Sequence, residues 1–545
     1  MRDSQVKKFS QRDWLLAAGL FVVGLAARIP FASKLLFHSD SVRFALAMEH
    51  FDVARMRPHA PGYILYVAAA KLAHLLIHDA RVSLVGVSVL SSALTIPVLY
   101  FLAAKMFGRS TALISSLLLL SSPLYWYNSE MPFTYALESL FALLFVYSCC
   151  GLVMGGRRWL IVSAVLLGLA AGVRPNIIIL FLPLWLFALR KYSFKHILSS
   201  FFVFGLTCLA WFAPLVIMTG GLGKYLTVLN AQYKMVVLYP ASYLFQVKVR
   251  TTIFLKFMLY GLTLGLLPMI YYFGRFFRIS SVVKDIRLRF LLIWIVPAVL
   301  FYTGVNIWNP GQVMVILPPL MIFMAESVKG LAKDKQEGLS KIMGGRPSSL
   351  FKVIKSIFSY KALLPVGVCI LLLVNIFIFL FGHTQVSYPA IKKEETRLTE
   401  LIRLTEENTS PEKTMILALF QNTQAGYYLP DYLICCPFPI IFSDAEIPVE
   451  AQNVYISHQH QTNPKTYWIP SGFKIQPIPV PEGVDTLMVW EKDIARYYQN
   501  EGRSLREIES GRMDVGVYSL KVEPGEKIHY GYHFWTVKER DPSQL

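Results

Sequence analysis

Side chains that can move protons or hold anions are concentrated in one polar segment of an otherwise apolar chain, residues 33–83. Within it, Asp40 lies between two serines, and Arg57 and His59 precede the sequence Pro61-Gly62-Tyr63. Carboxylates and imidazoles are the usual acids and bases of enzymes, and guanidinium groups bind anions. Apolar helices need no such segment in order to fold, so we expect the chemistry of this protein here.

The rest of the chain is dominated by sequences that suit membrane-spanning helices. Of 545 residues, 55% are hydrophobic, and the mean hydropathy is +0.48. A helix needs about 20 apolar residues to cross the hydrocarbon core of a bilayer. We therefore predict an α-helical polytopic membrane protein with about eleven transmembrane helices, at residues 14–32, 84–104, 110–128, 132–153, 158–172, 176–189, 197–219, 252–273, 290–305, 312–328 and 362–381.

The basic residues predict the orientation of these helices, because Lys and Arg are enriched in cytoplasmic loops. If residues 1–13 are cytoplasmic, the basic clusters near positions 7–12, 105–109, 157–158, 190–195, 275–289 and 329–361 all lie inside. An odd number of spans then places the C-terminal part outside. We predict an integral multi-pass protein of the inner (plasma) membrane, with a cytoplasmic N-terminus.

The net charge of +19 is divided unevenly along the chain. Residues 382–545 carry 16 Lys and Arg against 22 Asp and Glu, a balance of −6, whereas residues 1–381 carry a balance of +25. Because the surplus belongs to predicted cytoplasmic loops, it suits anionic lipids, and nucleic acid is not expected as a partner. Six acids of the membrane part remain at or near the outer face: Asp40, Glu49, Asp52, Asp79, Glu130 and Glu138.

Two outer segments interrupt the pattern of spans, residues 33–83 and 220–251. In the first, Ser41–Glu49 is typical of a short amphipathic helix lying along the membrane interface. The second mixes aromatic side chains with basic ones, including Lys248 and Arg250. This mixture suits a surface that meets sugars and phosphates, although an interfacial aromatic belt needs no function.

The last part of the chain, residues 382–545, reads as a separate extracytoplasmic α/β domain. A charged helix near 391–407 is followed by short strand-like runs separated by turns, and about 160 residues suffice for one domain. We find no nucleophile motif, phosphate loop or metal-ligand spacing in it. His458 and His460 are interpreted as residues of a solvated loop.

Several short motifs occur along the chain: Asp40-Ser-Val-Arg-Phe-Ala, His59-Ala-Pro-Gly-Tyr-Ile-Leu-Tyr66, Glu130-Met-Pro132, Gly168-Leu-Ala-Ala-Gly-Val-Arg-Pro175, Asn309-Pro-Gly-Gln312, Leu317-Pro-Pro319 and Tyr427-Tyr-Leu-Pro-Asp431. In this order they resemble motifs of the GT-C superfamily of polytopic glycosyltransferases that use lipid carriers. Within it, the chain is most similar to bacterial relatives of the protein O-mannosyltransferases and of the aminoarabinose transferase.

The resemblance implies that residues 14–381 form a catalytic domain that moves a sugar from a polyprenyl phosphate. The acceptor is a hydroxyl of a lipid, glycan or protein at the outer face, and the anomeric configuration is usually inverted. A general base must remove the acceptor proton, and Asp40 matches the loop aspartate of the family. The departing lipid phosphate must be held by fixed cations.

The resemblance assigns the other roles to a small set of residues. Arg57, His59 and Arg174 are the expected ligands of the carrier phosphate, followed by Lys248 and Arg250. Glu130 would orient Asp40 or hold a sugar hydroxyl, and Tyr63 and Glu138 would contact the substrate. The branch that the chain resembles generally needs no divalent cation, so no obligatory metal or cofactor is expected.

Structural explanations compete with these assignments. Asp40 would then only cap the helix that begins at Ser41, and Glu130 would be a helix-start carboxylate favoured by the helix dipole. Glu138 would be protonated and bonded to a neighbouring helix. Arg28 is expected to snorkel toward the interface.

Two other functions fit a polytopic chain. A transporter or flippase of a lipid-linked sugar would show an internal repeat and broken helices at the midplane, and we find no repeat. A non-catalytic membrane scaffold would have no reason to carry Asp40, His59 and Glu130 at family positions.

Overall fold

The computed structural model describes residues 9–236, 243–276, 278–342, 359–418, 421–436, 441–442, 455–457, 466–467, 478–511 and 515–528. The chain forms two compact units, and each combines distant parts of the sequence. The first consists of Met1–Ser33, Tyr63–Leu215 and Pro240–Ile391, and the second of Lys34–Gly62, Val216–Tyr239 and Lys392–Leu545.

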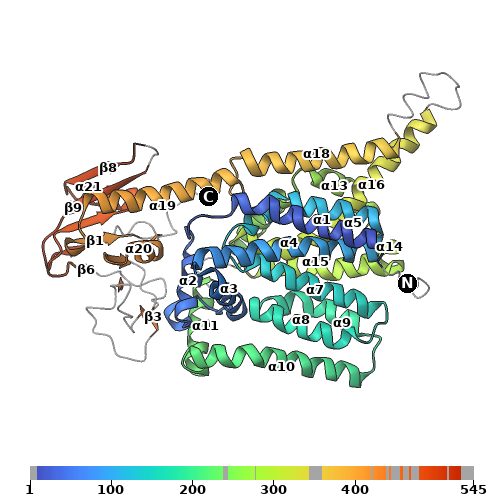
Figure 1. Ribbon diagram of the computed structural model, residues 1–545, viewed down its shortest axis with the longest axis horizontal. Coiled ribbons are helices and arrows are strands. Elements are labelled where there is room, and N and C mark those ends of the chain that lie inside the picture. The colour runs from blue at the N-terminus through green and yellow to red at the C-terminus, as the bar shows by residue number, and fades with distance from the viewer. Residues whose placement is uncertain are drawn as a thin grey trace. The chain divides into compact units, whose positions relative to one another are not determined.

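The first unit is a helical bundle (Figure 1). A helix is present in each of the eleven segments predicted to span the membrane. The α-helices are α1 (Gln11–Arg28), α3 (Ile64–Ile77), α4 (Ala80–Phe107), α5 (Arg109–Ser121), α6 (Pro123–Ser129), α7 (Tyr135–Val153), α8 (Trp159–Val173), α9 (Ile177–Leu189), α10 (Phe194–Met218), α12 (Tyr243–Leu262), α13 (Leu266–Phe276), α14 (Ile279–Lys284), α15 (Ile286–Gly304), α16 (Leu317–Ile342) and α18 (Tyr360–Phe381). Short 3-10 turns occur at η1 (Ile29–Phe31), η3 (Thr263–Gly265) and η4 (Pro310–Val315).

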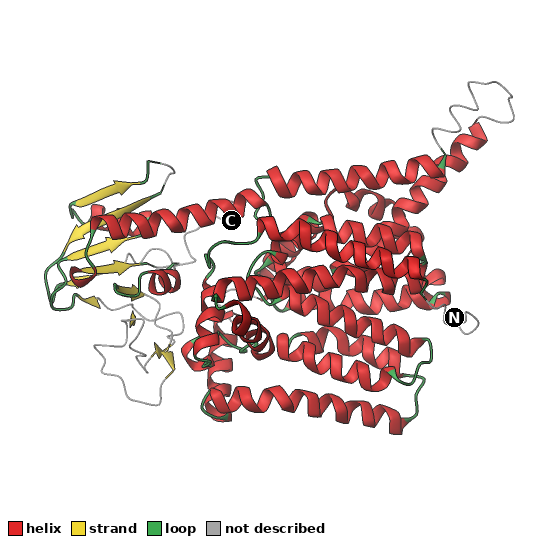
Figure 2. Cartoon of the chain, in the orientation of Figure 1, coloured by secondary structure: helices red, strands yellow, loops and turns green. Residues whose placement is uncertain are grey.

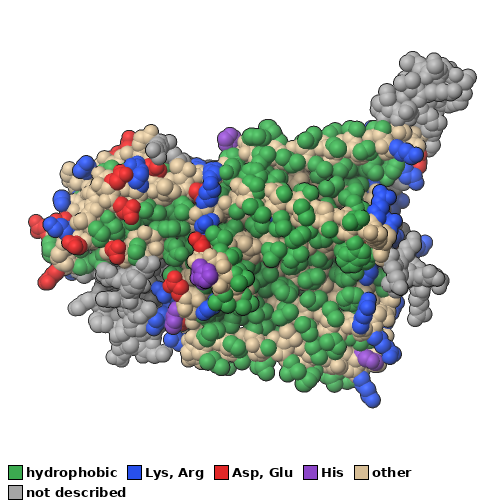
Figure 3. Space-filling view, viewed as in Figure 1, with side chains coloured by type: hydrophobic (Ala, Val, Ile, Leu, Met, Phe, Trp, Pro, Cys, Tyr) green, Lys and Arg blue, Asp and Glu red, His purple; other side chains and the backbone are tan. Residues whose placement is uncertain are grey.

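Length and composition make seven of the described helical segments able to cross a membrane alone. Four shorter apolar helices, α3, α5, α8 and α9, accompany them. Figure 3 shows the hydrophobic surface that covers the visible face of the bundle, with Lys and Arg gathered at the helix ends near the N-terminus. On α10 the exposed side chains include Leu198, Phe202 and Leu206. Such a surface belongs against lipid tails, so the chain is an integral membrane protein.

The helix α4 lies at the centre of the bundle, in contact with α1, α3, α5 and α7. Small residues allow these close approaches: a Cβ placed on Gly24 of α1 would stand 3.4 Å from the Ala93 Cα of α4. Polar side chains also join the helices. Asn375 of α18 accepts a hydrogen bond from Thr263 (2.5 Å) and donates one to Ser121 of α5 (3.1 Å).

The second unit is built around a mixed sheet in the strand order β4-β2-β1-β7-β9-β8 (Figure 2). The strands β2 and β7 are parallel to β1, and the outer pairings are antiparallel. Their bounds are β1 (Thr414–Leu417), β2 (Leu433–Cys436), β4 (Tyr455–Ser457), β7 (Thr486–Val489), β8 (Leu505–Glu509) and β9 (Gly516–Lys521). Two-residue strands pair as β3 (Ile441–Phe442) with β5 (Thr466–Tyr467) and as β6 (Ile478–Pro479) with β10 (Lys527–Ile528).

Helices cover both faces of this sheet. Leu398 and Leu401 of α19 (Tyr388–Asn408) and Ala425 of α20 (Asn422–Tyr428) belong to the core on one face. Ile494 and Tyr498 of α21 (Lys492–Asn500) belong to the core on the other face. The predicted α/β domain is therefore present, with β8 as an additional strand. A 3-10 turn, η5 (Pro411–Lys413), precedes β1, and His458 and His460 lie outside the described residues.

The second unit also contains parts of both segments that were predicted to lie outside, residues 34–62 and 216–239. They supply α2 (Ser39–Glu49), the turn η2 (Val53–Arg55) and α11 (Leu222–Val236). The predicted amphipathic helix is confirmed as α2, which buries Val42, Phe44 and Ala45. Since this unit holds Asp40, the arrangement of its loop segments decides the geometry of the candidate site.

Candidate functional site

Asp40 lies in the first turn of α2, but it does not cap that helix. The cap is His38, whose Nδ1 accepts a hydrogen bond from the Asp40 backbone N–H at 3.2 Å. Ser41 Oγ donates to the His38 carbonyl at 2.6 Å and closes the same turn. The capping explanation for Asp40 is therefore wrong, and its carboxylate is directed to other partners. The positive end of the helix dipole favours a negative charge at this position.

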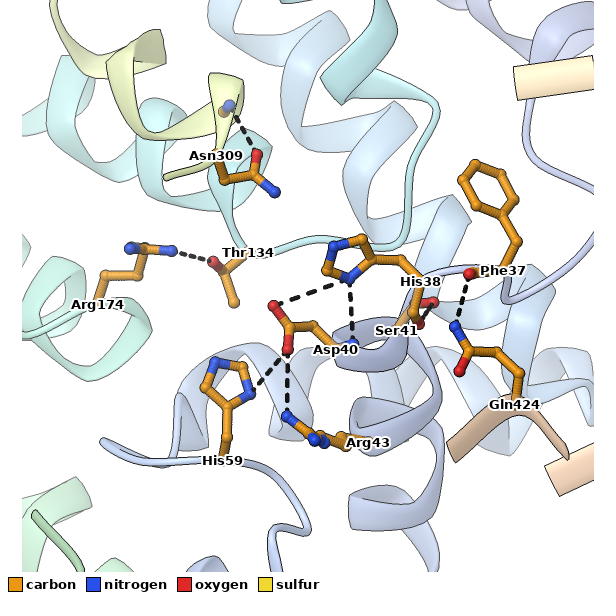
Figure 4. A network of polar contacts seen from close by, with 11 residues as sticks. Phe37, His38, Asp40, Ser41, Arg43, His59, Thr134, Arg174, Asn309 and Gln424 are labelled. Carbon is orange, nitrogen blue, oxygen red and sulfur yellow. Dashed lines mark hydrogen bonds and ion pairs between the residues drawn. The ribbon is translucent and has the colours of Figure 1, made fainter. Parts of the chain in front are cut away.

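Three basic side chains surround the Asp40 carboxylate (Figure 4). Its Oδ1 lies 3.4 Å from His59 Nδ1 and 3.7 Å from a terminal nitrogen of Arg43, and its Oδ2 lies 3.9 Å from His38 Nδ1. The Asp40 side chain is 27% exposed, and that of His59 is 13% exposed. The carboxylate is thus flanked by basic side chains and remains partly exposed.

The sequence motifs did not lead to a predicted role for Arg43. A signal for it exists in the spacing, since residues three apart on a helix face each other. Asp40 and Arg43 are separated in this way at the start of α2. The motif Asp40-Ser-Val-Arg43 therefore places an acid and a base together whenever the segment is helical.

A compact loop places His59 against Asp40. Asp52 and Arg57 form an isolated antiparallel bridge, with backbone N–O distances of 2.6 and 2.9 Å. The Asp52 side chain accepts a hydrogen bond from the Ala54 N–H at 2.9 Å and so caps η2. The Gly62 N–H donates to the His59 carbonyl at 3.0 Å, in a turn where Gly62 has a φ of 107° that favours glycine.

Helix α11 supports the same loop. Its Val228 packs with Val53, Ala54 and Ala60 in a small apolar cluster. The Tyr225 hydroxyl donates to the Pro61 carbonyl at 3.1 Å. Burial raises the pKa of Tyr225 to about 12, so this hydroxyl stays protonated and able to donate. Residues 34–62 and 216–239 therefore hold each other in place within the second unit.

In the bundle, Arg174 and Glu138 form a buried ion pair with Nε and Oε2 3.1 Å apart. Arg174 follows the C-terminus of α8, and Glu138 lies in the first turn of α7. Arg174 also donates to Thr134 Oγ1 at 3.1 Å (Figure 4). Its guanidinium carbon lies 4.6 Å from the Tyr135 ring centroid and 5.5 Å from that of Tyr63. The ion pair neutralises much of the charge on Arg174.

The Asn309-Pro-Gly-Gln312 motif supports this ion pair from the other side. Asn309 Oδ1 accepts a hydrogen bond from the Gly311 N–H at 2.9 Å and caps η4. A Cβ on Gly311 would overlap the ring of Tyr135. Glycine at this position therefore allows Tyr135 to approach closely and to stack on Arg174.

We expect Gly311→Ala to destabilise the bundle by about 1–3 kcal/mol, because the added methyl overpacks the Tyr135 ring. The measurement is the thermal unfolding midpoint of the purified protein in detergent. Gly205→Ala is the matched control, since a Cβ there meets no atom within 4 Å and alanine is the better helix former. An unchanged midpoint for Gly311→Ala would show that Tyr135 is not held by this contact.

Glu130 is fully buried at the end of α6, and its charge interacts with that of Arg28. Burial raises the pKa of the Glu130 carboxyl well above its usual range, while the positive charge of Arg28 acts in the opposite direction. Arg28 is itself fully buried and donates to the Gly24 and Leu120 carbonyls at 3.1 and 3.4 Å. The expectation that Arg28 snorkels is therefore wrong, because a buried carboxyl group and two carbonyls receive it.

The two remaining basic candidates differ in their surroundings. Arg250 of α12 is 2% exposed and donates to the Gly304 carbonyl (2.9 Å) and to Gln246 Oε1 (2.8 Å). These contacts link α12 to the end of α15. Lys248 is exposed on the same helix. Within the described part of the chain, no group of three or more His, Cys, Asp or Glu side chains is arranged to hold a metal ion.

The comparison with known proteins agrees with the family resemblance that the sequence motifs indicate. Residues 59–218 match the family described as dolichyl-phosphate-mannose-protein mannosyltransferase. A comparison with curated proteins gives no match.

Solved structures show the same fold. ArnT from Cupriavidus metallidurans in the apo state is 14% identical, with a TM-score of 0.57 over 93% of this chain and 97% of that one. The same protein bound to undecaprenyl phosphate is 13% identical, with a TM-score of 0.54 over 94% and 97%. The predicted resemblance to the GT-C superfamily is confirmed at the level of the fold.

Proposed function

Because the chain has the GT-C fold and carries part of the mannosyltransferase sequence pattern, we propose that it is a membrane glycosyltransferase. The proposed reaction moves a sugar from a polyprenyl phosphate to an acceptor hydroxyl at the outer face of the membrane, with inversion. Undecaprenyl phosphate bound to the similar ArnT structure supports a donor of this chemical class. The acceptor class, a lipid, a glycan or a protein, is left open.

The observation that carries this proposal is the Asp40 carboxylate with Arg43 and His59 beside it. In the proposed reaction the acceptor oxygen forms a bond to the anomeric carbon. The bond from that carbon to the phosphate oxygen breaks, and its electron pair leaves with the lipid phosphate. Asp40 takes the acceptor proton as general base. Arg43 and His59 hold the carboxylate in place for this proton transfer.

Negative charge grows on the lipid phosphate as it leaves, and fixed cations stabilise it. In the second unit we assign this role to His59 and Arg57, the residues on either side of Pro58. Arg174, Lys248 and Arg250 of the bundle stay as proposed phosphate ligands, and Arg174 ranks first because Tyr63, Tyr135 and Thr134 already orient its guanidinium plane.

The acidic residues of the bundle complete the proposal. Glu138 and Tyr63 are proposed to contact the sugar next to Arg174. Glu130, whose charge interacts with that of Arg28, keeps the proposed role of holding a sugar hydroxyl. In this scheme protein cations stabilise the phosphate, so we expect chelation with EDTA to leave the transfer rate unchanged. A rate that falls with EDTA and returns with Mg²⁺ or Mn²⁺ would contradict this prediction.

The experiment that tests the function starts from a deletion strain of the organism that carries the gene. Loss of a glycosyltransferase should remove one sugar from an envelope lipid, glycan or protein and should raise the level of a polyprenyl-phosphate sugar. Mass spectrometry of both fractions identifies that sugar as a pentose or a hexose. The purified protein should then transfer the sugar in detergent, where a flippase or a scaffold would produce no new glycosidic bond.

A further inference from the structure

The segment directly before α2 is held by the C-terminal part of the chain. The Leu36 N–H donates to the Tyr428 hydroxyl at 2.7 Å. Gln424 Nε2 donates to the Phe37 carbonyl at 2.7 Å (Figure 4). The Lys34 N–H donates to Glu395 Oε1 at 2.5 Å. Three side chains from α19 and α20 thus bind the backbone of residues 34–37, which are almost 400 positions away in sequence.

Apolar packing reinforces these hydrogen bonds. Leu35 and Phe37 pack against the sheet core that includes Leu398, Ala425 and Tyr432, and Leu36 is fully buried. A buried backbone N–H needs a partner, because leaving it unpaired costs the full desolvation of the group. The Tyr428 hydroxyl meets that need for Leu36.

This attachment fixes the start of the helix that carries Asp40. Phe37 is followed by His38, the residue that caps α2, and Asp40 lies in the first turn. A shift of residues 35–37 would therefore move the cap and the carboxylate together. Helix α2 also lies against α20, the helix that carries Gln424 and Tyr428.

From these contacts we propose that the C-terminal domain holds the Asp40 helix in position, with Gln424 and Tyr428 as positioning residues. The domain then serves catalysis through the placement of the proposed base, in addition to any contact with an acceptor. The catalytic consequence depends on the function proposed above, whereas the mechanical attachment does not.

The test uses the full-length protein in detergent, with Tyr428→Phe and Gln424→Glu as variants. Each preserves the size of the side chain and removes one bond to residues 36–37. Tyr432→Phe is the matched control, because the Tyr432 hydroxyl donates to the Thr409 carbonyl (3.0 Å) and makes that bond inside the C-terminal domain.

Hydrogen exchange measured by mass spectrometry reports the attachment without any substrate. We expect peptides covering residues 34–49 to exchange about 3- to 10-fold faster in Tyr428→Phe and Gln424→Glu, since one such hydrogen bond is worth about that factor in local opening. The peptides of the sheet should be unchanged in both variants. Tyr432→Phe should leave residues 34–49 as in the wild type.

Transfer kinetics then separate positioning from a merely structural role. With the donor found in the deletion strain, the two variants should lower kcat about 3- to 10-fold and leave KM for the donor unchanged. Unchanged exchange at residues 34–49 would overturn the attachment, and faster exchange with a wild-type kcat would overturn the positioning role. Full transfer by Asp40→Asn, together with faster exchange in Tyr428→Phe, would instead refute the proposed base and leave the attachment standing.

Discussion

Asp40→Asn should lower the rate of sugar transfer by about 10²–10⁴-fold, the contribution typical of a general base. The amide has nearly the same shape as the carboxylate but cannot take the acceptor proton at neutral pH. Because Asp40 is partly exposed, its ion pairs with Arg43 and His59 contribute about 0–1 kcal/mol to stability. The variant should therefore fold normally. Transfer is measured with purified protein and the donor identified from the deletion strain.

Asp52→Asn is the matched control for this experiment. Asp52 lies in the same polar segment, but its side chain caps η2 by accepting the Ala54 N–H. Asparagine caps as well as aspartate does, so transfer should be close to that of the wild type. Undecaprenyl phosphate serves as a binding probe, and thermal stabilisation by it should persist in Asp40→Asn. Full transfer activity in Asp40→Asn would rule out Asp40 as the base.

Glu138→Leu should lower the free energy of unfolding of the helical bundle by about 3–5 kcal/mol. The reason is that Arg174 would keep its charge in a buried position while losing the carboxylate 3.1 Å away. Arg174→Met should have a smaller cost, because the buried Glu138 can take up a proton and become neutral once Arg174 is absent. In the double variant no buried charge is left, and most of the stability should return. The thermal midpoints of the four proteins form a double-mutant cycle.

The same four proteins test the roles proposed for this ion pair. The double variant should be stable but inactive if Arg174 holds the carrier phosphate and Glu138 contacts the sugar. Thermal stabilisation by undecaprenyl phosphate should be lost in Arg174→Met and kept in Glu138→Leu. If the stable double variant transfers sugar at the wild-type rate, the ion pair is structural, and the phosphate role of Arg174 is wrong.

The candidate residues are divided between the two compact units. Asp40 and His59 belong to the same compact unit as the C-terminal sheet, whereas Glu138 and Arg174 belong to the bundle. Changes in α20 should therefore affect the position of Asp40, and changes in η4 should affect the position of Arg174. Gly311→Ala and Tyr428→Phe probe these two dependencies separately.

The sequence by itself determined the helical membrane class and the candidate base. Long apolar runs specify helices without reference to the fold, because a bilayer requires internal hydrogen bonding over a fixed length. Short motifs gave Asp40, His59 and the Asn309-Pro-Gly-Gln312 turn, since their spacing is a local property. The amphipathic helix α2 followed from the same kind of pattern.

The tertiary structure decided the partners of these residues. No local pattern connects residues 34–37 with Gln424 and Tyr428, because the hydrogen bonds that join them close a loop of nearly 400 residues. Burial of Arg28 depends on a carbonyl and a carboxyl group brought in by other helices, and so it contradicted a prediction based on position along one helix. Local spacing thus identifies which side chains can do chemistry, whereas long-range packing determines which charges face them and what holds them in place.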